Sequence, residues 1–329
     1  MQDRDLVARI VAGDPQGLAA AYDRYAPALY TYCRSMLHDA DDAADALQDT
    51  FVVAARKLDG LRDPDRLRPW LYAVARNECL RRIKARASTV ELEQAGEVSD
   101  DAVDLEAGVR QSEIQELVRS AFGGLNPGDR EVLELSLRHE LDGADLGAAL
   151  GVSANHAHAL LSRARTQLET SLGALLVART GRESCPELAG ILEGWDGELS
   201  VLLRKRVNRH IENCEVCGER RSLQLRPEAL LGALPILLLP PHLRTKIMRL
   251  VGDALPEAVT YRDQVARRAE PFDRAGFPAP LDRRRRPIPV AWQSHGSKRK
   301  PIAVSVIVLL LFAVLGVSAA LAVHILTPT

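Results

Sequence analysis

The sequence predicts an all-α protein built from several small helical units. Aromatic residues make up only 4 % of the 329 residues. Long stretches rich in Ala, Leu, Arg and Glu favour helices over the strands of a sandwich or barrel. The apolar content of 47 % is sufficient for hydrophobic cores and excludes a wholly disordered chain. At about 150 residues per domain, the length predicts roughly two domains with accessory segments.

Residues 1–87 form the first predicted domain, and one of its helices has two distinct faces. Apolar side chains recur every three or four positions from Ala44 to Leu58, which predicts a buried stripe. The face opposite this stripe is acidic. Because an acidic surface repels DNA phosphates, that face is available to a protein partner. We expect that face to expose Asp41, Asp42, Asp45, Gln48 and Asp49.

A basic stretch follows from Lys57 to Arg86, with nine basic and four acidic residues. Its cations suit neutralisation of phosphates, and its aromatic rings suit stacking on unpaired bases. The alternative is a solvated basic helix whose aromatic residues belong to the core. The candidate DNA-binding residues of this stretch are Arg68, Trp70, Arg76, Asn77, Arg81 and Arg82.

Residues 88–112 are predicted to be an acidic linker, and residues 113–178 a second helical domain. In the second domain, Asn126 followed by Pro127 marks a helix start. Gly151 and Ser153 predict a tight turn and a cap, so two short helices form a helix-turn-helix. The second of these helices carries the candidate DNA-binding residues Asn155, His156, His158, Arg163 and Arg165.

The chain resembles extracytoplasmic-function (group IV) sigma factors in the order of its predicted elements. These are an acidic amphipathic helix, a basic Trp-Leu helix, a linker and a helix-turn-helix. The resemblance rests on DAADALQDTFVVAARKL, RPWLYAVARNECLRRIKAR and LNPGDREVLELSLRHELDGADLGAALGVSANHAHALLSRARTQL, and covers roughly residues 1–175. It implies that Asp45, Gln48 and Asp49 face core RNA polymerase. It also implies that Arg76, Asn77, Arg81 and the loop 60–67 approach an unpaired base of the promoter −10 element.

The recognition helix departs from the family pattern at its start. The resemblance implies that this helix reads the promoter −35 element, but His156 and His158 stand where the family carries residues such as Thr, Lys and Ser. Largely neutral imidazoles are weaker donors, so the −35 contacts are expected to be weak or altered.

Residues 183–251 are predicted to be a zinc-binding domain. His210, Cys214 and Cys217 follow an H-x3-C-x2-C pattern, in which one helical turn brings the imidazole beside two thiolates. Cys185 is the candidate fourth ligand, or alternatively a bystander. The motif resembles zinc-binding anti-sigma domains, which implies a structural Zn²⁺ and an intramolecular contact with the sigma-like part. Thiolates bind the ion and can be oxidised, so loss of Zn²⁺ is a candidate trigger.

The remaining sequence predicts a membrane tether. Residues 252–300, rich in Pro and Arg, are expected to be a linker without regular structure. Residues 302–326 are apolar except for His324, and about 1.5 Å per residue makes them long enough to cross a bilayer. Because Arg283–Arg286 and Lys298–Lys300 precede this span, the N-terminal bulk is expected in the cytoplasm of a single-pass protein of the cell membrane.

The sequence therefore predicts a membrane-tethered sigma factor that binds core RNA polymerase and promoter DNA and is regulated in cis by its zinc-binding domain. The chain is not expected to be an enzyme, because it contains no phosphate-binding glycine loop and no complete zinc-deaminase signature. The first alternative is a membrane-anchored helix-turn-helix regulator that does not engage polymerase. The second is a sigma-like interaction scaffold.

Overall fold

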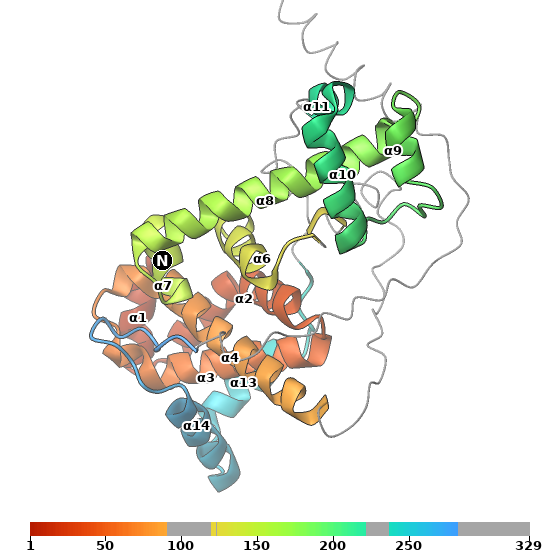
Figure 1. Cartoon of the computed structure of the whole chain (residues 1–329). Coiled ribbons are helices and arrows are strands. Elements are labelled where there is room, and N and C mark those ends of the chain that lie inside the picture. The colour runs from red at the N-terminus through yellow and green to blue at the C-terminus, as the bar shows by residue number, and fades with distance from the viewer. Residues whose placement is uncertain (91–119, 123, 222–236, 282–329) are drawn as a thin grey trace, which may run out of the picture.

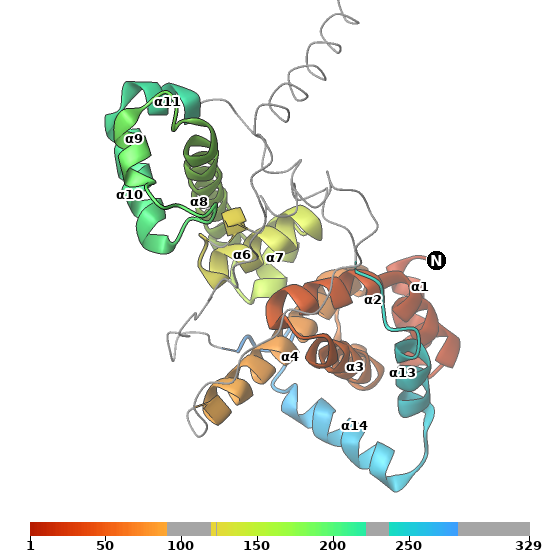
Figure 2. The same cartoon turned by 90° about the vertical axis from the view of Figure 1, so that its right-hand side faces the viewer.

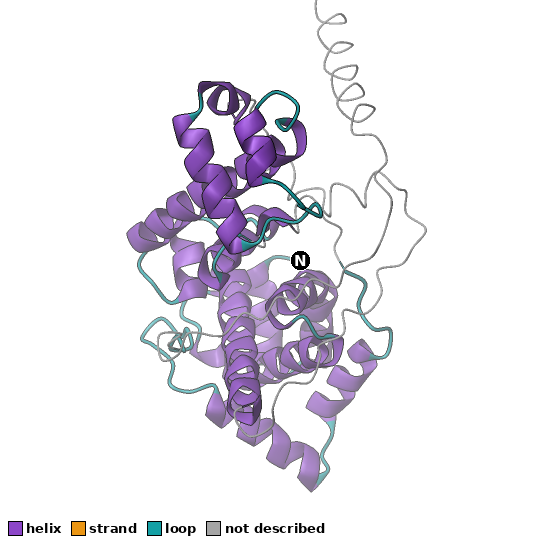
Figure 3. Cartoon of the chain, turned by 45° about the vertical axis from the view of Figure 1, so that its right-hand side comes forward, coloured by secondary structure: helices purple, strands orange, loops and turns teal. Residues whose placement is uncertain are grey.

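The computed structural model describes residues 1–90, 120–122, 124–221 and 237–281. Within these ranges the regular structure is helical, apart from one isolated antiparallel bridge between Phe272 and Pro278 (Figure 3). The predicted all-α class is therefore confirmed for the described part of the chain.

The first ninety residues form four helices around one core (Figure 1). The predicted apolar stripe is confirmed, since Leu47, Phe51 and Leu58 are buried. Asp14 and Asp39 cap two of the helices by accepting hydrogen bonds from backbone N–H groups of the first turn. The helices are α1 (Asp3–Val11), α2 (Pro15–Leu37), α3 (Ala40–Lys57) and α4 (Leu67–Val90), with short 3-10 turns at Leu58–Gly60 and Pro64–Arg66 between α3 and α4.

The predicted helix start and helix-turn-helix of the second domain are confirmed. Asn126 Oδ1 accepts from the backbone N of Asp129 at 2.8 Å. Gly151 adopts a left-handed φ of 71°, and the Ser153 side chain accepts from His156 N. The elements are α6 (Pro127–Leu133), a π-helical turn (Glu134–Arg138), α7 (Gly143–Leu150) and α8 (Ala154–Thr180).

Helix α8 extends beyond the domain predicted over 113–178 and belongs to two cores. Its N-terminal half packs on α6 and α7. Its last turns bury Leu175 and Val177 against α9 (Pro186–Ile191), α10 (Val201–Asn213) and α11 (Glu215–Arg221). The boundary predicted near residue 178 therefore lies in a continuous helix, because the apolar ALLVA stretch extends it.

Residues 237–281, called the strap below, differ most from the prediction. The strap contains α13 (Leu243–Gly252), which packs on α2 and α3, and α14 (Pro256–Arg268), which packs on α3 (Figure 2). The linker predicted over 252–300 is therefore wrong for residues 256–268, and the domain predicted over 183–251 wrongly includes most of α13. The physical reason is an apolar stripe of Leu243 and Ile247, both buried in the core of α1–α4.

Several predicted segments lie outside the described residues. These are residues 91–112 of the acidic linker and the span predicted over 302–326. Among the residues that are described, no helix has the length and apolar character needed to cross a membrane.

Candidate polymerase and promoter interface

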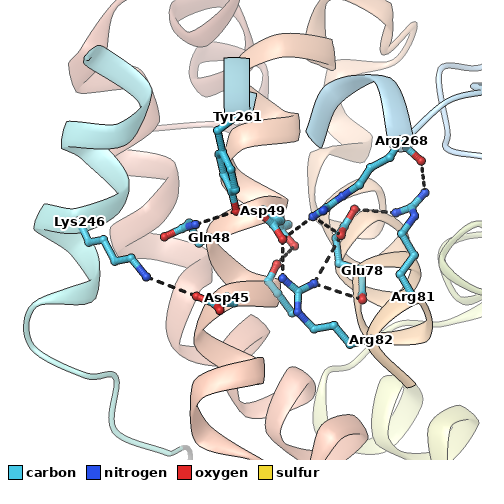
Figure 4. A network of polar contacts seen from close by, with 11 residues as sticks. Asp45, Gln48, Asp49, Glu78, Arg81, Arg82, Lys246, Tyr261 and Arg268 are labelled. Atoms are coloured by element: carbon cyan, nitrogen blue, oxygen red, sulfur yellow. Dashed lines mark hydrogen bonds and ion pairs between the residues drawn. The ribbon is translucent and has the colours of Figure 1, made fainter. Parts of the chain in front are cut away.

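The polar face of α3 is covered by the strap (Figure 4). Asp49 is 1 % exposed and Gln48 is 5 % exposed. Tyr261 Oη donates to Asp49 Oδ1 at 2.5 Å and accepts from Gln48 Nε2 at 2.9 Å. The side chain of Asp45 is 50 % exposed and pairs with Lys246 Nζ at 3.3 Å. The prediction that Gln48 and Asp49 are exposed is therefore wrong, because α13 and α14 close over them.

Asp49 and Glu78 form a buried carboxylate pair held by arginines of two segments. Arg268 of α14 donates to Asp49 Oδ2 at 2.5 Å and to Glu78 Oε2 at 3.0 Å. Arg82 of α4 also pairs with Asp49, and Arg81 donates to Glu78 Oε1 at 2.6 Å. Burial raises the pKa of Glu78, and the positive charges of Arg81 and Arg268 oppose that shift. Because buried carboxylates require partners, the candidate DNA contacts Arg81 and Arg82 are engaged inside the protein.

The C-terminal end of the strap covers the candidate base-contacting side of α4. Trp70 is fully buried, and its Nε1 donates to the carbonyl oxygen of Gly276 at 2.6 Å. The ring of Phe272 stacks on Trp70 with 6.4 Å between centroids. Asn77 donates to the carbonyl of Ala279 at 2.9 Å and accepts from Leu281 N at 3.1 Å. In this structure Trp70 and Asn77 are therefore occupied by the strap, and their contact with DNA stays a prediction.

Arg76 and Arg68 connect the first domain to the second. Arg76 Nε lies 2.9 Å from Glu131 Oε1, and both side chains are buried. Arg68 donates to the backbone carbonyl of His139. Burial lowers the pKa of His139 to about 3, so its imidazole is neutral. The cationic side of α4 therefore packs against the second domain, so Arg76 is engaged inside the protein in this arrangement and its contact with DNA stays a prediction.

The recognition helix α8 keeps most of its candidate face accessible. Asn155, His156 and His158 are exposed. Arg163 is 63 % exposed and pairs with Asp129 at 2.8 Å, and Arg165 is half-buried. The helix-turn-helix therefore presents polar groups to solvent.

Cys185, His210, Cys214 and Cys217 come together, with their ligand atoms all within 4.8 Å of one another. Cys185 Sγ lies 3.3 Å from His210 Nε2 and 4.0 Å from Cys214 Sγ. Two thiolates about 2.3 Å from a tetrahedral Zn²⁺ lie about 3.8 Å apart, so the spacing suits such an ion. This arrangement favours Cys185 as a ligand over a bystander.

The surroundings of the cluster also fit a metal ion. Glu187 Oε2 lies 3.5 Å from His210 Nδ1, where a carboxylate orients a ligating imidazole. A hydrogen bond from the backbone of Cys217 lowers the pKa of Cys214 and favours its thiolate. Burial raises the pKa of Cys217 to about 12, so its thiolate form requires a nearby cation. The four residues could therefore hold a metal.

Comparisons with known proteins identify the family. Residues 21–89 match the family model for Sigma-70 region 2. The chain is 31 % identical over 182 residues to the RNA polymerase sigma factor CnrH of Cupriavidus metallidurans, covering 52 % of this chain and 95 % of that protein. This chain belongs to the extracytoplasmic-function sigma factor family. It is also 29 % identical over 150 residues to SigM of Bacillus subtilis, covering 45 % of this chain and 90 % of that protein.

The family assignment confirms the part of the prediction that makes this chain a sigma factor. Sigma factors direct transcription initiation and are not enzymes, which agrees with the expected class of protein. A third relative, SigG of Mycobacterium tuberculosis, is 29 % identical over 176 residues, which are 46 % of this chain and 48 % of that protein. The segments matched by these relatives span about half of this sigma factor. The strap lies outside the region 2 match.

Sequence reasoning missed four residues that organise this sigma factor's interface. Glu78 was counted only as an acid within a basic stretch, although its position on the inner side of α4 gave a helical-phase signal. Glu131 lies near the start of α6, where an acidic side chain is favourable in any helix, so nothing in the sequence indicated its pairing with Arg76. Tyr261 and Arg268 lie in a segment whose proline and arginine content masked a helix.

Proposed function

We propose that this chain is a membrane-tethered sigma factor that binds core RNA polymerase, directs promoter-specific initiation, and is regulated in cis by its C-terminal half. One observation carries the proposal: the chain matches region 2 over a pair of adjacent helices with opposite chemistry. Helix α3 carries Asp45, Gln48 and Asp49, and α4 carries Trp70, Asn77 and Arg81. Negative side chains suit a protein partner, whereas cations and aromatic rings suit separated DNA strands.

In the active form, we assign distinct partners to the three surfaces. The α3 residues contact core polymerase. Trp70, Arg76, Asn77 and Arg81 approach the unpaired −10 strand once they have left their present partners. The exposed start of α8, with Asn155 and His156, contacts the −35 element. This assignment requires the first and second domains to separate, since Arg76 now binds Glu131.

The zinc-binding unit and the tether complete the proposal. Cys185, His210, Cys214 and Cys217 hold a structural Zn²⁺, which supplies cross-links between the segments that carry α9, α10 and α11. Residues 302–326 anchor the chain in the cell membrane, with the rest in the cytoplasm. Fusion in one chain raises the local concentration of an inhibitory segment to roughly millimolar, so weak docking suffices for regulation.

The test uses the full chain with core RNA polymerase. With core polymerase in excess we expect co-purification and promoter-dependent transcription in vitro, because docking in cis lowers the apparent affinity without abolishing binding. Asn155→Ala together with His156→Ala should lower transcription and leave core binding unchanged, because both residues lie on the exposed DNA-facing side of α8. DNA binding without any binding of core polymerase would contradict the proposal and favour the helix-turn-helix regulator.

A further inference from the structure

We propose that the strap is the inhibitory element of this sigma factor. It occupies the polymerase-facing side of α3 and the base-facing side of α4 together, so that polymerase and the strap exclude each other. This inference rests on the function proposed above and deepens it, because it assigns cis-inhibition to residues 237–281 rather than to the zinc-binding unit.

The strap belongs to the core of the sigma domain. Leu243 and Ile247 of α13 are 1 % and 0 % exposed, and Val265 of α14 is 1 % exposed. All three, together with Phe277, belong to the cluster that contains the core of α1–α4. Burial on this scale shows a specific intramolecular interface that removes apolar surface from water.

Polar groups of the strap occupy the positions where the polymerase contacts are assigned. Tyr261 and Arg268 bind Asp49, Tyr261 also binds Gln48, and Lys246 pairs with Asp45 (Figure 4). A polymerase surface cannot contact Gln48 and Asp49 until Tyr261 and Arg268 have moved away.

Further ion pairs hold the strap around the α3 contacts. Arg244 binds Asp23 of α2 through two hydrogen bonds of 2.7 and 2.9 Å. Asp263 of α14 pairs with Arg56, and Glu270 lies 2.5 Å from Lys57. Each of these three strap charges thus meets an opposite charge on α2 or α3, which helps to fix the register of the strap.

The end of the strap blocks the promoter side by direct backbone contact. Gly276 has a φ of 86°, and a Cβ atom built there would lie 2.1 Å from the carbonyl oxygen of Gly60. Arg62 N donates to the carbonyl of Ala275 at 3.2 Å. The strap therefore lies on the loop 60–67 that is assigned to the −10 base, and it also accepts the Trp70 hydrogen bond.

The zinc-binding unit is placed elsewhere. Helices α10 and α11 pack on the C-terminal half of α8, and Arg204 of α10 donates to the carbonyl of Ser120. The described contacts to Asp45, Gln48 and Asp49 from the C-terminal half come from α13 and α14. The strap, and not the zinc-binding unit, therefore covers the α3 residues that are assigned to polymerase.

The experiment compares full-length variants in their affinity for core RNA polymerase. The release variant carries Arg244→Glu, Asp263→Arg and Glu270→Lys, which turn three attractive pairs into repulsive ones. The matched control carries Arg267→Glu and Glu257→Lys, which change charge on exposed positions of α14. A closed fraction lowers apparent affinity, so we expect the release variant to bind core polymerase about tenfold more tightly, with the control unchanged.

Two additions make the result decisive. Adding Asp23→Arg to the release variant restores one pair and should return part of the inhibition. Arg268→Glu, which places a third carboxylate beside Asp49 and Glu78, is a second and independent release variant. Hydrogen exchange of peptides from α13, α14 and α1–α4 reports whether the strap has detached from a domain that is still folded.

Detachment of the strap in either release variant without tighter polymerase binding would overturn the inference. So would a Cys214→Ser chain that binds polymerase tightly while α13 and α14 stay protected, because inhibition would then reside in the zinc-binding unit. Failure of every form to bind polymerase or support transcription would instead remove the proposed function itself.

Discussion

The Nη2 atom of Arg268 in α14 lies 2.5 Å from Oδ2 of Asp49 in α3, although the two residues are 219 positions apart in the chain. The same guanidinium reaches Glu78 on α4. A single side chain of the strap therefore neutralises two buried carboxylates on the two helices that carry the sigma region 2 surface. Sequestration of that surface and stability of the strap are thus coupled through one ion-pair network.

Removal of this guanidinium should destabilise the strap. Arg268→Ala leaves Asp49 with Arg82 and Glu78 with Arg81 and Arg82, so both carboxylates stay partly compensated. Arg268 is 40 % exposed, which reduces the effect through solvent screening, and we expect a loss of about 1–2 kcal/mol. Urea unfolding followed by tyrosine fluorescence measures the change. Arg267→Ala is the control and should change stability by less than about 0.5 kcal/mol; an equal loss in both would contradict the assigned role of Arg268.

Contacts between residues close together in the chain could be predicted from the sequence, whereas contacts with distant segments could not. Local signals were sufficient for Asn126 and Ser153, whose caps are set by the neighbouring backbone, and for Phe51, whose burial follows helical periodicity. The spacing of His210 and Cys214 likewise predicted that these residues lie together in one Cys/His cluster. The burial of Asp49 was not predictable in this way, because a polar residue on an outer helical face reads as exposed until a distant segment supplies its partners.

The interface between the first and second domains should weaken on acidification. His139 packs against the rings of Tyr32 and Tyr72, and burial lowers its pKa to about 3 from 6.5. A lowered pKa means that the unfolded chain binds the proton more readily, so stability is full above pH 6.5 and falls as the pH drops toward 3. Between pH 7 and pH 5 the loss should be about 2 kcal/mol. Thermal unfolding across this range measures it.

His139→Phe is the matched variant for this titration. It keeps an aromatic ring beside Tyr32 and Tyr72. It removes the titrating group together with a buried Nε2 atom that has no hydrogen-bond partner among the described residues. The stability of this variant should fall much less between pH 7 and pH 5. An unchanged pH dependence would assign the effect to other groups.

Removal of metal should unfold the α9–α11 unit selectively. This unit has a small core that includes Cys185 and Cys217 themselves, so a bound ion would supply much of its folding energy. We expect about one Zn²⁺ per chain by elemental analysis, lost in Cys185→Ser and in Cys214→Ser. Chelation should expose α10 to hydrogen exchange and leave α1–α4 protected. Cys33→Ser, in the core of the first domain, should retain the metal, and loss of metal in that variant would place the ion elsewhere.

The Arg76–Glu131 pair should show strong energetic coupling between the first and second domains. Their side chains are 9 % and 3 % exposed, and the Nε–Oε1 distance is 2.9 Å. Glu131→Leu leaves the Arg76 cation buried without this partner and should cost about 3 kcal/mol, whereas replacement of both charges in Arg76→Met with Glu131→Leu should cost much less. A double-mutant cycle on unfolding free energies measures the coupling. Additive losses would show that the two groups act independently, and the closed arrangement of the domains would then depend on the apolar contacts between α4 and α7.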